Sequence, residues 1–117
     1  MALPEFKQIV DAAKAQIQEI GPAELTRILD AGDDFSLIDI READEQAQGM
    51  MPGAIALPRG ILERDIDKVT TDKDRKIVLY CAGGSRSALA ALNLKQMGFR
   101  NVSSLDAGYG GWEKVQS

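Results

Sequence analysis

Three short apolar runs, each bounded by polar, glycine or proline positions, constrain the fold of this chain more than any other feature. Such runs are typical of strands buried on both faces, and they cover residues 35–40, 54–57 and 77–80. A weaker run and a candidate edge strand cover residues 102–105 and 19–20. Helical patterns lie between the runs, at residues 42–48, 61–69 and 87–97. This alternation predicts an α/β domain with a mainly parallel sheet.

The first residues predict an additional helix ahead of this alternating pattern. Its apolar residues follow one face from residue 4 to about residue 16. The Gly21-Pro22 pair then interrupts the chain and begins a second, shorter helix that ends near Gly32. We expect residues 1–17 to form a helical extension packed on a domain of residues 18–117, with a dimer interface as the alternative use of the apolar face.

Length and charge bound the class of protein. A chain of 117 residues with 44% hydrophobic and 27% charged residues fits one soluble globular domain. The net charge of −4 argues against broad binding to nucleic acids or acidic membranes, because both need a positive surface. No apolar stretch approaches the roughly 18 residues of a membrane span, and the start of the chain lacks the pattern of a secretory signal. A cytoplasmic location is expected.

The chain has one cysteine and no histidine, which removes several mechanisms. A single cysteine forms no internal disulfide and no thiolate cluster for zinc. Without histidine, the chain alone cannot run Ser-His-Asp hydrolysis, Cys-His proteolysis or histidine-ligated metal catalysis. We therefore expect neither a metal nor a cofactor.

That cysteine, Cys81, stands where the run at residues 77–80 ends and a glycine-rich loop begins. Ligands of open α/β sheets bind beyond the carboxyl ends of the strands. The loop can direct several N–H groups inward and leads into a helix whose positive dipole end faces the same point; its residues are Ala82, Gly83, Gly84, Ser85, Arg86 and Ser87. Such a cradle lowers the pKa of a thiol from about 8.5 toward or below neutrality. A buried, inert cysteine is the alternative, but the combined pattern favours a nucleophile.

Residues 80–88 strongly resemble the active-site loop of single-domain rhodaneses, the thiosulfate sulfurtransferases. Residues 37–42, followed by 49–55 and 57–60, resemble a second signature of that family, and residues 105–112 resemble its closing motif. The resemblance spans about residues 18–114. It implies a single rhodanese-like domain in which helices flank a central sheet of about five strands.

The resemblance also implies a two-step reaction. The Cys81 thiolate would attack the outer sulfur of a donor such as thiosulfate, become a persulfide, and pass the sulfur to cyanide or to a thiol acceptor, which can be a thiol protein. Residues 82–87 would bind the anionic donor, with Arg86 orienting its sulfonate. Two positions depart from many relatives: Met50 replaces a histidine, and Ala82 replaces a longer polar or basic side chain.

Three further residues are candidates near the site. Arg41 follows Asp39 at a strand end, and it is a candidate for substrate binding, although an arginine there more often pairs with a carboxylate. Asp39 is interpreted as an anchor for the loop backbone rather than as an acid catalyst. Arg59 is a candidate for the pocket rim, where it would attract anions.

Two other functions stay open. Dual-specificity phosphatases and arsenate reductases share the fold but place five residues between cysteine and arginine. Here that arginine position is Ser87, and the shorter loop favours sulfur over phosphate. Alternatively, the chain is a sulfur-relay module fed by a partner protein, and with no second cysteine it needs an outside acceptor in either case.

Overall fold

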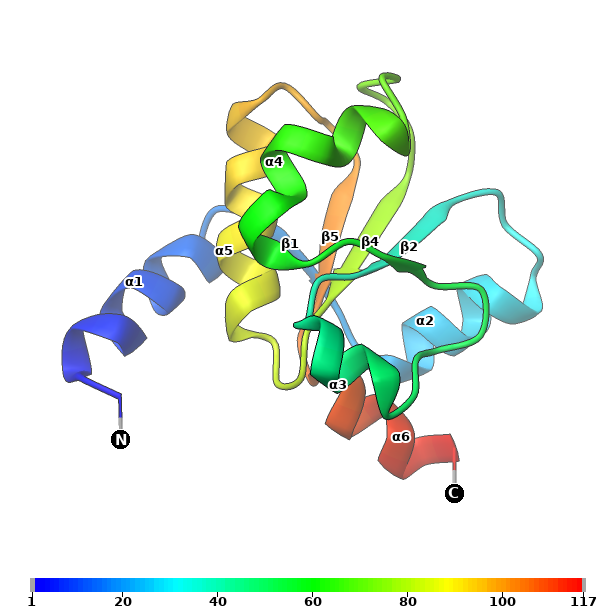
Figure 1. Ribbon diagram of the computed structural model, residues 1–117, viewed down its shortest axis with the longest axis horizontal. Coiled ribbons are helices and arrows are strands. Elements are labelled where there is room, and N and C mark those ends of the chain that lie inside the picture. The colour runs from blue at the N-terminus through cyan, green and yellow to red at the C-terminus, as the bar shows by residue number, and fades with distance from the viewer. Residues whose placement is uncertain (1, 117) are drawn as a thin grey trace.

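Five parallel strands form one sheet with helices on both faces in the computed structural model, which describes residues 2–116 (Figure 1). The strands are β1 (Gln18–Ile20), β2 (Ser36–Asp39), β3 (Ile55–Ala56), β4 (Ile77–Tyr80) and β5 (Val102–Leu105). Their order across the sheet is β1-β5-β4-β2-β3, and every neighbouring pair is parallel. The predicted parallel sheet of about five strands is confirmed. β4 lies at its centre, so the strand that leads into Cys81 is the most protected one.

Helices connect the strands. The α-helices are α1 (Pro4–Lys14), α2 (Pro22–Asp30), α3 (Ala43–Ala47), α4 (Leu62–Asp65), α5 (Ser85–Gln96) and α6 (Gly108–Gln116). Two short 3-10 helices flank α4, η1 (Arg59–Ile61) and η2 (Ile66–Lys68). Among residues 2–116, no helix is both long enough and apolar enough to cross a membrane.

The sheet buries a separate apolar layer on each face. Alternate residues of a strand point to opposite faces, and on β4 Ile77 and Leu79 pack in one layer while Val78 and Tyr80 pack in the other. The first layer includes residues of α4 and α5, and the second includes residues of α2 and α6 (Figure 1). All four β4 side chains are fully buried, which explains why this strand reads as an uninterrupted apolar run.

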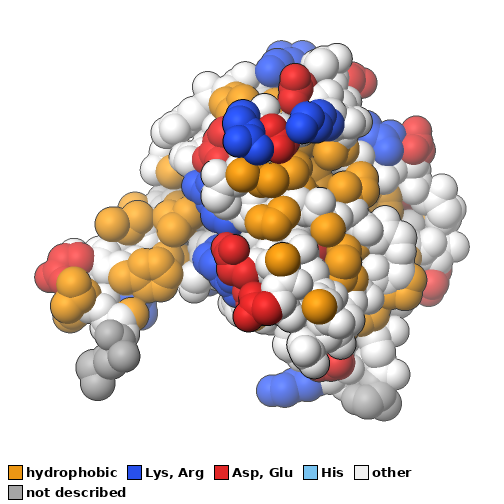
Figure 2. Space-filling view, viewed as in Figure 1, with side chains coloured by type: hydrophobic (Ala, Val, Ile, Leu, Met, Phe, Trp, Pro, Cys, Tyr) orange, Lys and Arg blue, Asp and Glu red, His pale blue; other side chains and the backbone are white. Residues whose placement is uncertain are grey.

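The N-terminal helix α1 lies against α5 at one side of the domain (Figure 1). Val10 and Ala13 on its inner face are 4% and 1% exposed, whereas Leu3 and Ile9 are 71% and 59% exposed. Figure 2 shows apolar side chains on the surface of α1, which projects from the rest of the domain. The helix ends at Lys14, two residues before the expected end.

The sequence pattern did not predict α6. Its first four residues are Gly108-Tyr109-Gly110-Gly111, and glycine in a helix interior costs up to about 1 kcal/mol relative to alanine. Tertiary contacts override this low propensity, because Tyr109 and Trp112 pack against the apolar layer beside α2.

Candidate active site

The loop that carries Cys81 joins the carboxyl end of β4 to the amino end of α5. Gly84 caps the helix with φ +98°, a left-handed conformation that favours glycine. A Cβ at Gly84 would also collide with the carbonyl group of Asp106. The second glycine of the predicted Gly-Gly pair is therefore required both by backbone conformation and by space.

The start of α6 holds this loop from the other side. Tyr109 N–H donates to the Cys81 carbonyl oxygen at 2.8 Å, and Gly110 N–H donates to that of Ala82 at 3.2 Å. Gly108 has φ +64°, and a Cβ there would collide with the Ala82 carbonyl group. The closing motif, residues 105–112, thus holds the Cys81 loop in place.

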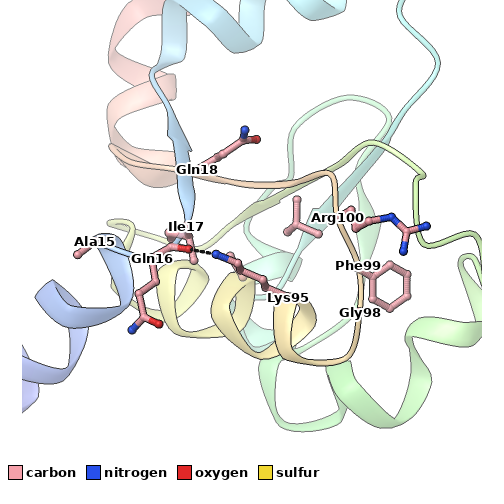
Figure 3. A pocket seen from close by; sticks show the side chains of 10 residues that line it. Ala15, Gln16, Ile17, Gln18, Lys95, Gly98, Phe99 and Arg100 are labelled. Atoms are coloured by element: carbon pink, nitrogen blue, oxygen red, sulfur yellow. Dashed lines mark hydrogen bonds between the residues drawn. The ribbon is translucent and has the colours of Figure 1, made fainter.

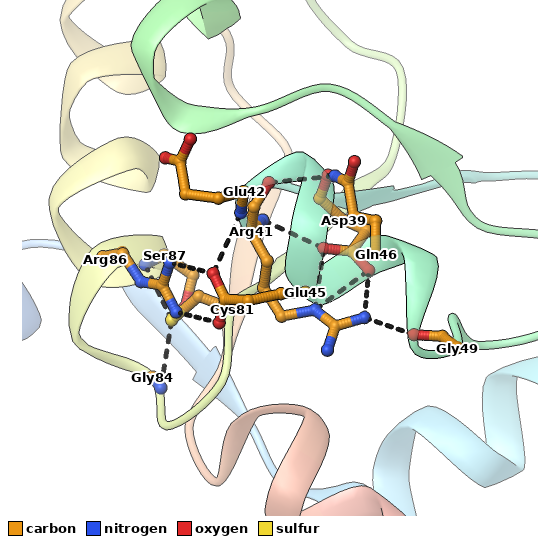
Figure 4. Close-up of polar contacts among 10 residues, drawn as sticks. All are labelled: Asp39, Arg41, Glu42, Glu45, Gln46, Gly49, Cys81, Gly84, Arg86 and Ser87. Carbon is orange, nitrogen blue, oxygen red and sulfur yellow. Dashed lines mark hydrogen bonds and ion pairs between the residues drawn. The ribbon is translucent and has the colours of Figure 1, made fainter.

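The Cys81 sulfur lies inside the loop, within reach of several hydrogen-bond donors (Figure 4). Gly84 N–H is 3.2 Å from Sγ, Ser87 N–H is 3.3 Å from it, and Ser87 Oγ is 3.5 Å from it. Burial raises the pKa of the thiol, but hydrogen bonds from Ser87 and from the N–H groups of Gly84 and Gly83 outweigh burial, so the pKa of Cys81 is lowered. The geometry favours a thiolate in a residue that is only 1% exposed.

The Ser87 hydroxyl is in contact with a second buried hydroxyl, that of Ser104. Ser87 Oγ is 2.7 Å from Ser104 Oγ of β5, and both serines are fully buried. Sequence reasoning missed Ser104. The available signal was a serine within a strand that begins and ends with apolar residues, Val102 and Leu105.

Arg86 extends from the first turn of α5 to α3, where its guanidinium binds the Glu45 carboxylate through two hydrogen bonds of 2.8 and 3.0 Å (Figure 4). Glu45 also accepts a hydrogen bond from the backbone of Glu42 at 3.0 Å. The hydrogen bonds with Arg86 contribute most and the one from Glu42 contributes next, and together they lower the pKa of Glu45 to about 2. Sequence reasoning placed Arg86 by the thiol but did not single out Glu45, because only the tertiary fold brings the two together.

Arg41 and Asp39 form a buried ion pair at the carboxyl end of β2. Asp39 Oδ2 is 2.8 Å from Arg41 Nη2, and Asp39 Oδ1 accepts the Arg41 backbone N–H at 2.9 Å. Arg41 also donates to the Gly49 carbonyl oxygen at 2.6 Å, and its guanidinium lies 4.2 Å from the ring centroid of Tyr109. These contacts tie Arg41 to Asp39, Gly49 and Tyr109. The arginine nevertheless borders a cavity of about 260 Å³ that Ala82, Tyr109 and Gly110 also line.

Arg59 pairs with a carboxylate of α4. Its Nη1 is 2.8 Å from both carboxylate oxygens of Glu63 on α4, and Glu63 also accepts a hydrogen bond of 2.7 Å from Asn93. The structure thus brings together Cys81, the loop residues 82–87 and the Asp39–Arg41 pair, while the Arg59 side chain bonds to Glu63.

Another hollow lies away from Cys81. A cavity of about 680 Å³ lies between the link from α1 to β1 and the last turn of α5, at the opposite end of α5 from the loop (Figure 3). Ile17, Phe99 and Lys95 are among its lining residues, and Lys95 Nζ donates to the Gln16 carbonyl oxygen at 2.6 Å. In residues 2–116, no group of three or more His, Cys, Asp or Glu side chains could hold a metal ion.

Residues 21–115 match the family model described as the rhodanese-like domain. The chain belongs to the rhodanese family. A sulfurtransferase of Allochromatium vinosum is 36% identical to this rhodanese domain over 98 residues, which cover 84% of this chain and 90% of that protein. The thiosulfate sulfurtransferase GlpE of Pseudoalteromonas translucida is 30% identical over 100 residues, covering 86% and 92%. These relatives support a sulfurtransferase activity in general terms.

The rhodanese fold is also seen in a solved structure from Rhodopseudomonas palustris, which is similar to this chain with a TM-score of 0.86 and 32% identity. That match covers 100% of this chain, α1 included, and 96% of the other. The Rhodopseudomonas protein is described as being of unknown function and a possible tyrosine phosphatase. The family and fold expected from the sequence are confirmed.

Proposed function

We propose that this rhodanese takes a sulfane sulfur from thiosulfate, carries it as a persulfide on Cys81, and passes it to cyanide or to a thiol, including the thiol of a protein. The observation that carries the proposal is the position of Cys81 Sγ, within 3.5 Å of the Ser87 hydroxyl and of two backbone N–H groups. These donors stabilise an anionic sulfur without a histidine base.

In the first step, the Cys81 thiolate attacks the outer sulfur of thiosulfate. A bond forms between Sγ and that sulfur, the S–S bond of thiosulfate breaks, and sulfite leaves with the electron pair. In the second step, cyanide attacks the terminal sulfur of the persulfide, thiocyanate forms, and Sγ leaves again as a thiolate. Charge balances in both steps, so no proton transfer or redox partner is needed.

Arg86 is the candidate residue for binding the oxygen atoms of the donor, because a guanidinium can donate two parallel hydrogen bonds to an oxyanion. Its two hydrogen bonds to Glu45 mean that a thiosulfate dianion has to compete with a carboxylate for it. The positive end of the α5 dipole adds attraction at the same point. Ala82 contributes only a small side chain to the mouth of the loop, which leaves room for the donor.

Thiocyanate formation from thiosulfate and cyanide tests the proposal, with the Cys81→Ser variant as the control. The native chain should form thiocyanate, and Cys81→Ser should not. The same protein is then offered an aryl phosphate. Release of phosphate without formation of thiocyanate would overturn the proposal.

The phosphatase alternative has one specific observation in its favour, the description of the Rhodopseudomonas structure as a possible tyrosine phosphatase. Against it stands the loop, in which four residues rather than five separate Cys81 from Arg86.

A further inference from the structure

Ser104 places a hydroxyl group inside the apolar layer between the sheet and α5. It lies on β5, opposite Leu79 of β4 in the strand register, and is 0% exposed. Within residues 2–116, its Oγ has one hydrogen-bond partner, the Ser87 Oγ at 2.7 Å. A buried hydroxyl needs a partner to offset its lost hydration, so the orientation of each hydroxyl depends on the other.

The state of the sulfur sets the direction of this chain of hydrogen bonds. A thiolate can only accept, so the Ser87 hydroxyl must donate to Cys81 Sγ across 3.5 Å. The Ser87 oxygen then accepts the proton of the Ser104 hydroxyl. With a thiolate, therefore, both buried hydroxyl protons have acceptors.

Protonation of the Cys81 sulfur disrupts this chain of hydrogen bonds. If the thiol donates to Ser87, the Ser87 proton turns toward Ser104, and the Ser104 proton is left without an acceptor among the described residues. If the hydroxyls keep their directions instead, Ser87 donates to a neutral sulfur, which is a weak acceptor. Both cases favour the anionic sulfur, because a buried donor without a partner is costly.

We propose that Ser104 is a positioning residue, which fixes the Ser87 hydroxyl as a donor to Cys81 Sγ and so holds the sulfur as an anion. Its consequence for sulfur transfer rests on the proposed function. Sγ is an anion before it attacks the donor and again when the acceptor expels it, so Ser104 acts on both steps without touching a substrate.

The charged groups around the loop lie elsewhere and stay unchanged when Ser104 is replaced. They are Arg86 on α5, Glu42 and Glu45 at the start of α3, the Asp39–Arg41 pair after β2, and Asp106 after β5. A shift in the titration of Cys81 caused by Ser104 therefore reports the hydroxyl chain rather than a change of local charge.

The test is the pH dependence of Cys81 alkylation by iodoacetamide, measured without any sulfur donor. Ser104→Ala and Ser104→Gly both remove the hydroxyl, so the result does not depend on one substitution being tolerated. Each should raise the midpoint by about one pH unit, which slows alkylation about tenfold at a pH below both midpoints. Ser103→Ala is the matched control: Ser103 lies beside Ser104 on β5 but donates to Gln18 of β1, so its loss should leave the midpoint unchanged.

A double-mutant cycle separates positioning from a structural effect. In a Ser87→Ala background, Ser104→Ala should cause no further shift, because the hydroxyl that it orients is gone. Ser104→Thr keeps a hydroxyl and should retain the native midpoint. An unchanged midpoint in Ser104→Ala and Ser104→Gly, or an equal shift with and without Ser87, overturns the proposal. Because alkylation needs no sulfur donor, the result is independent of whether thiocyanate is formed.

Discussion

The Glu45 carboxylate holds the Arg86 guanidinium through two hydrogen bonds, 2.8 Å from Oε1 to Nη1 and 3.0 Å from Oε2 to Nη2. The pair joins the first turns of α3 and α5 next to the Cys81 loop. Because Glu45 is ionised down to a pKa of about 2, it offsets the Arg86 charge throughout the physiological pH range. If the proposed function holds, an anionic donor is therefore attracted less strongly than Arg86 alone suggests.

We expect Glu45→Gln to raise kcat/KM for thiosulfate about five- to tenfold at low salt, because one negative charge beside the donor is removed. The gain should shrink as salt is added, since the effect is electrostatic. Steady-state thiocyanate formation at several salt concentrations measures it. Glu63→Gln is the matched control, because Glu63 also pairs with an arginine, but with Arg59 rather than Arg86. A gain of the same size in both variants would contradict the account.

The lowered pKa of Cys81 predicts an alkylation profile with a midpoint below that of an ordinary thiol, about 8.5. The rate should fall as the pH falls through the folded-state pKa, because only the thiolate reacts. Because the pKa of Cys81 is lower in the folded chain than in the unfolded chain, the thiolate contributes most to the free energy of unfolding at a pH above the unfolded-state pKa. This contribution is lost as the pH falls through the folded-state pKa. The chain unfolded in guanidinium chloride is the control and should titrate near 8.5. Coincident folded and unfolded profiles would mean that the loop does not stabilise the anion.

Much of the site was predictable from the sequence because it is contiguous. One strand, one loop and one helix hold Cys81, Gly84 and Ser87, so local patterns place them together. Glu45 and Ser104 could not be found in this way, since they lie 41 and 17 residues from their partners and only the fold brings them close. The α6 helix was missed for a related reason, because packing overrides the poor helix propensity of its glycines.

The buried Asp39–Arg41 pair should matter more for stability than for sulfur transfer. Asp39→Asn leaves the Arg41 charge buried without its carboxylate, and we expect it to lower the free energy of unfolding by about 3–5 kcal/mol. Urea denaturation measures this change. Glu24→Gln breaks the exposed pair with Arg27 and is expected to change stability little. If Asp39→Asn were as stable as the native chain while its thiosulfate KM rose, Arg41 would be a substrate contact instead.

Gly108→Ala tests how α6 fastens the loop. The φ of +64° and the adjacent Ala82 carbonyl group both disfavour a side chain, so the variant should lose at least about 1 kcal/mol of stability. Because the displaced loop also holds Cys81, alkylation of the thiol should slow at neutral pH. Gly60→Ala is the control, since a Cβ at Gly60 meets no atom within 4 Å. Native-like alkylation in Gly108→Ala would show that α6 does not shape the loop.

Mass spectrometry of the chain, after it has reacted with thiosulfate and before any acceptor is added, tests the proposed persulfide on Cys81. A persulfide on Cys81 predicts a gain of one sulfur atom on the peptide that contains Cys81, and loss of that sulfur as thiocyanate when cyanide is added. Cys81→Ser should gain nothing. A folded native chain that acquires no sulfur on Cys81, although thiosulfate is in excess, would rule out the proposed persulfide.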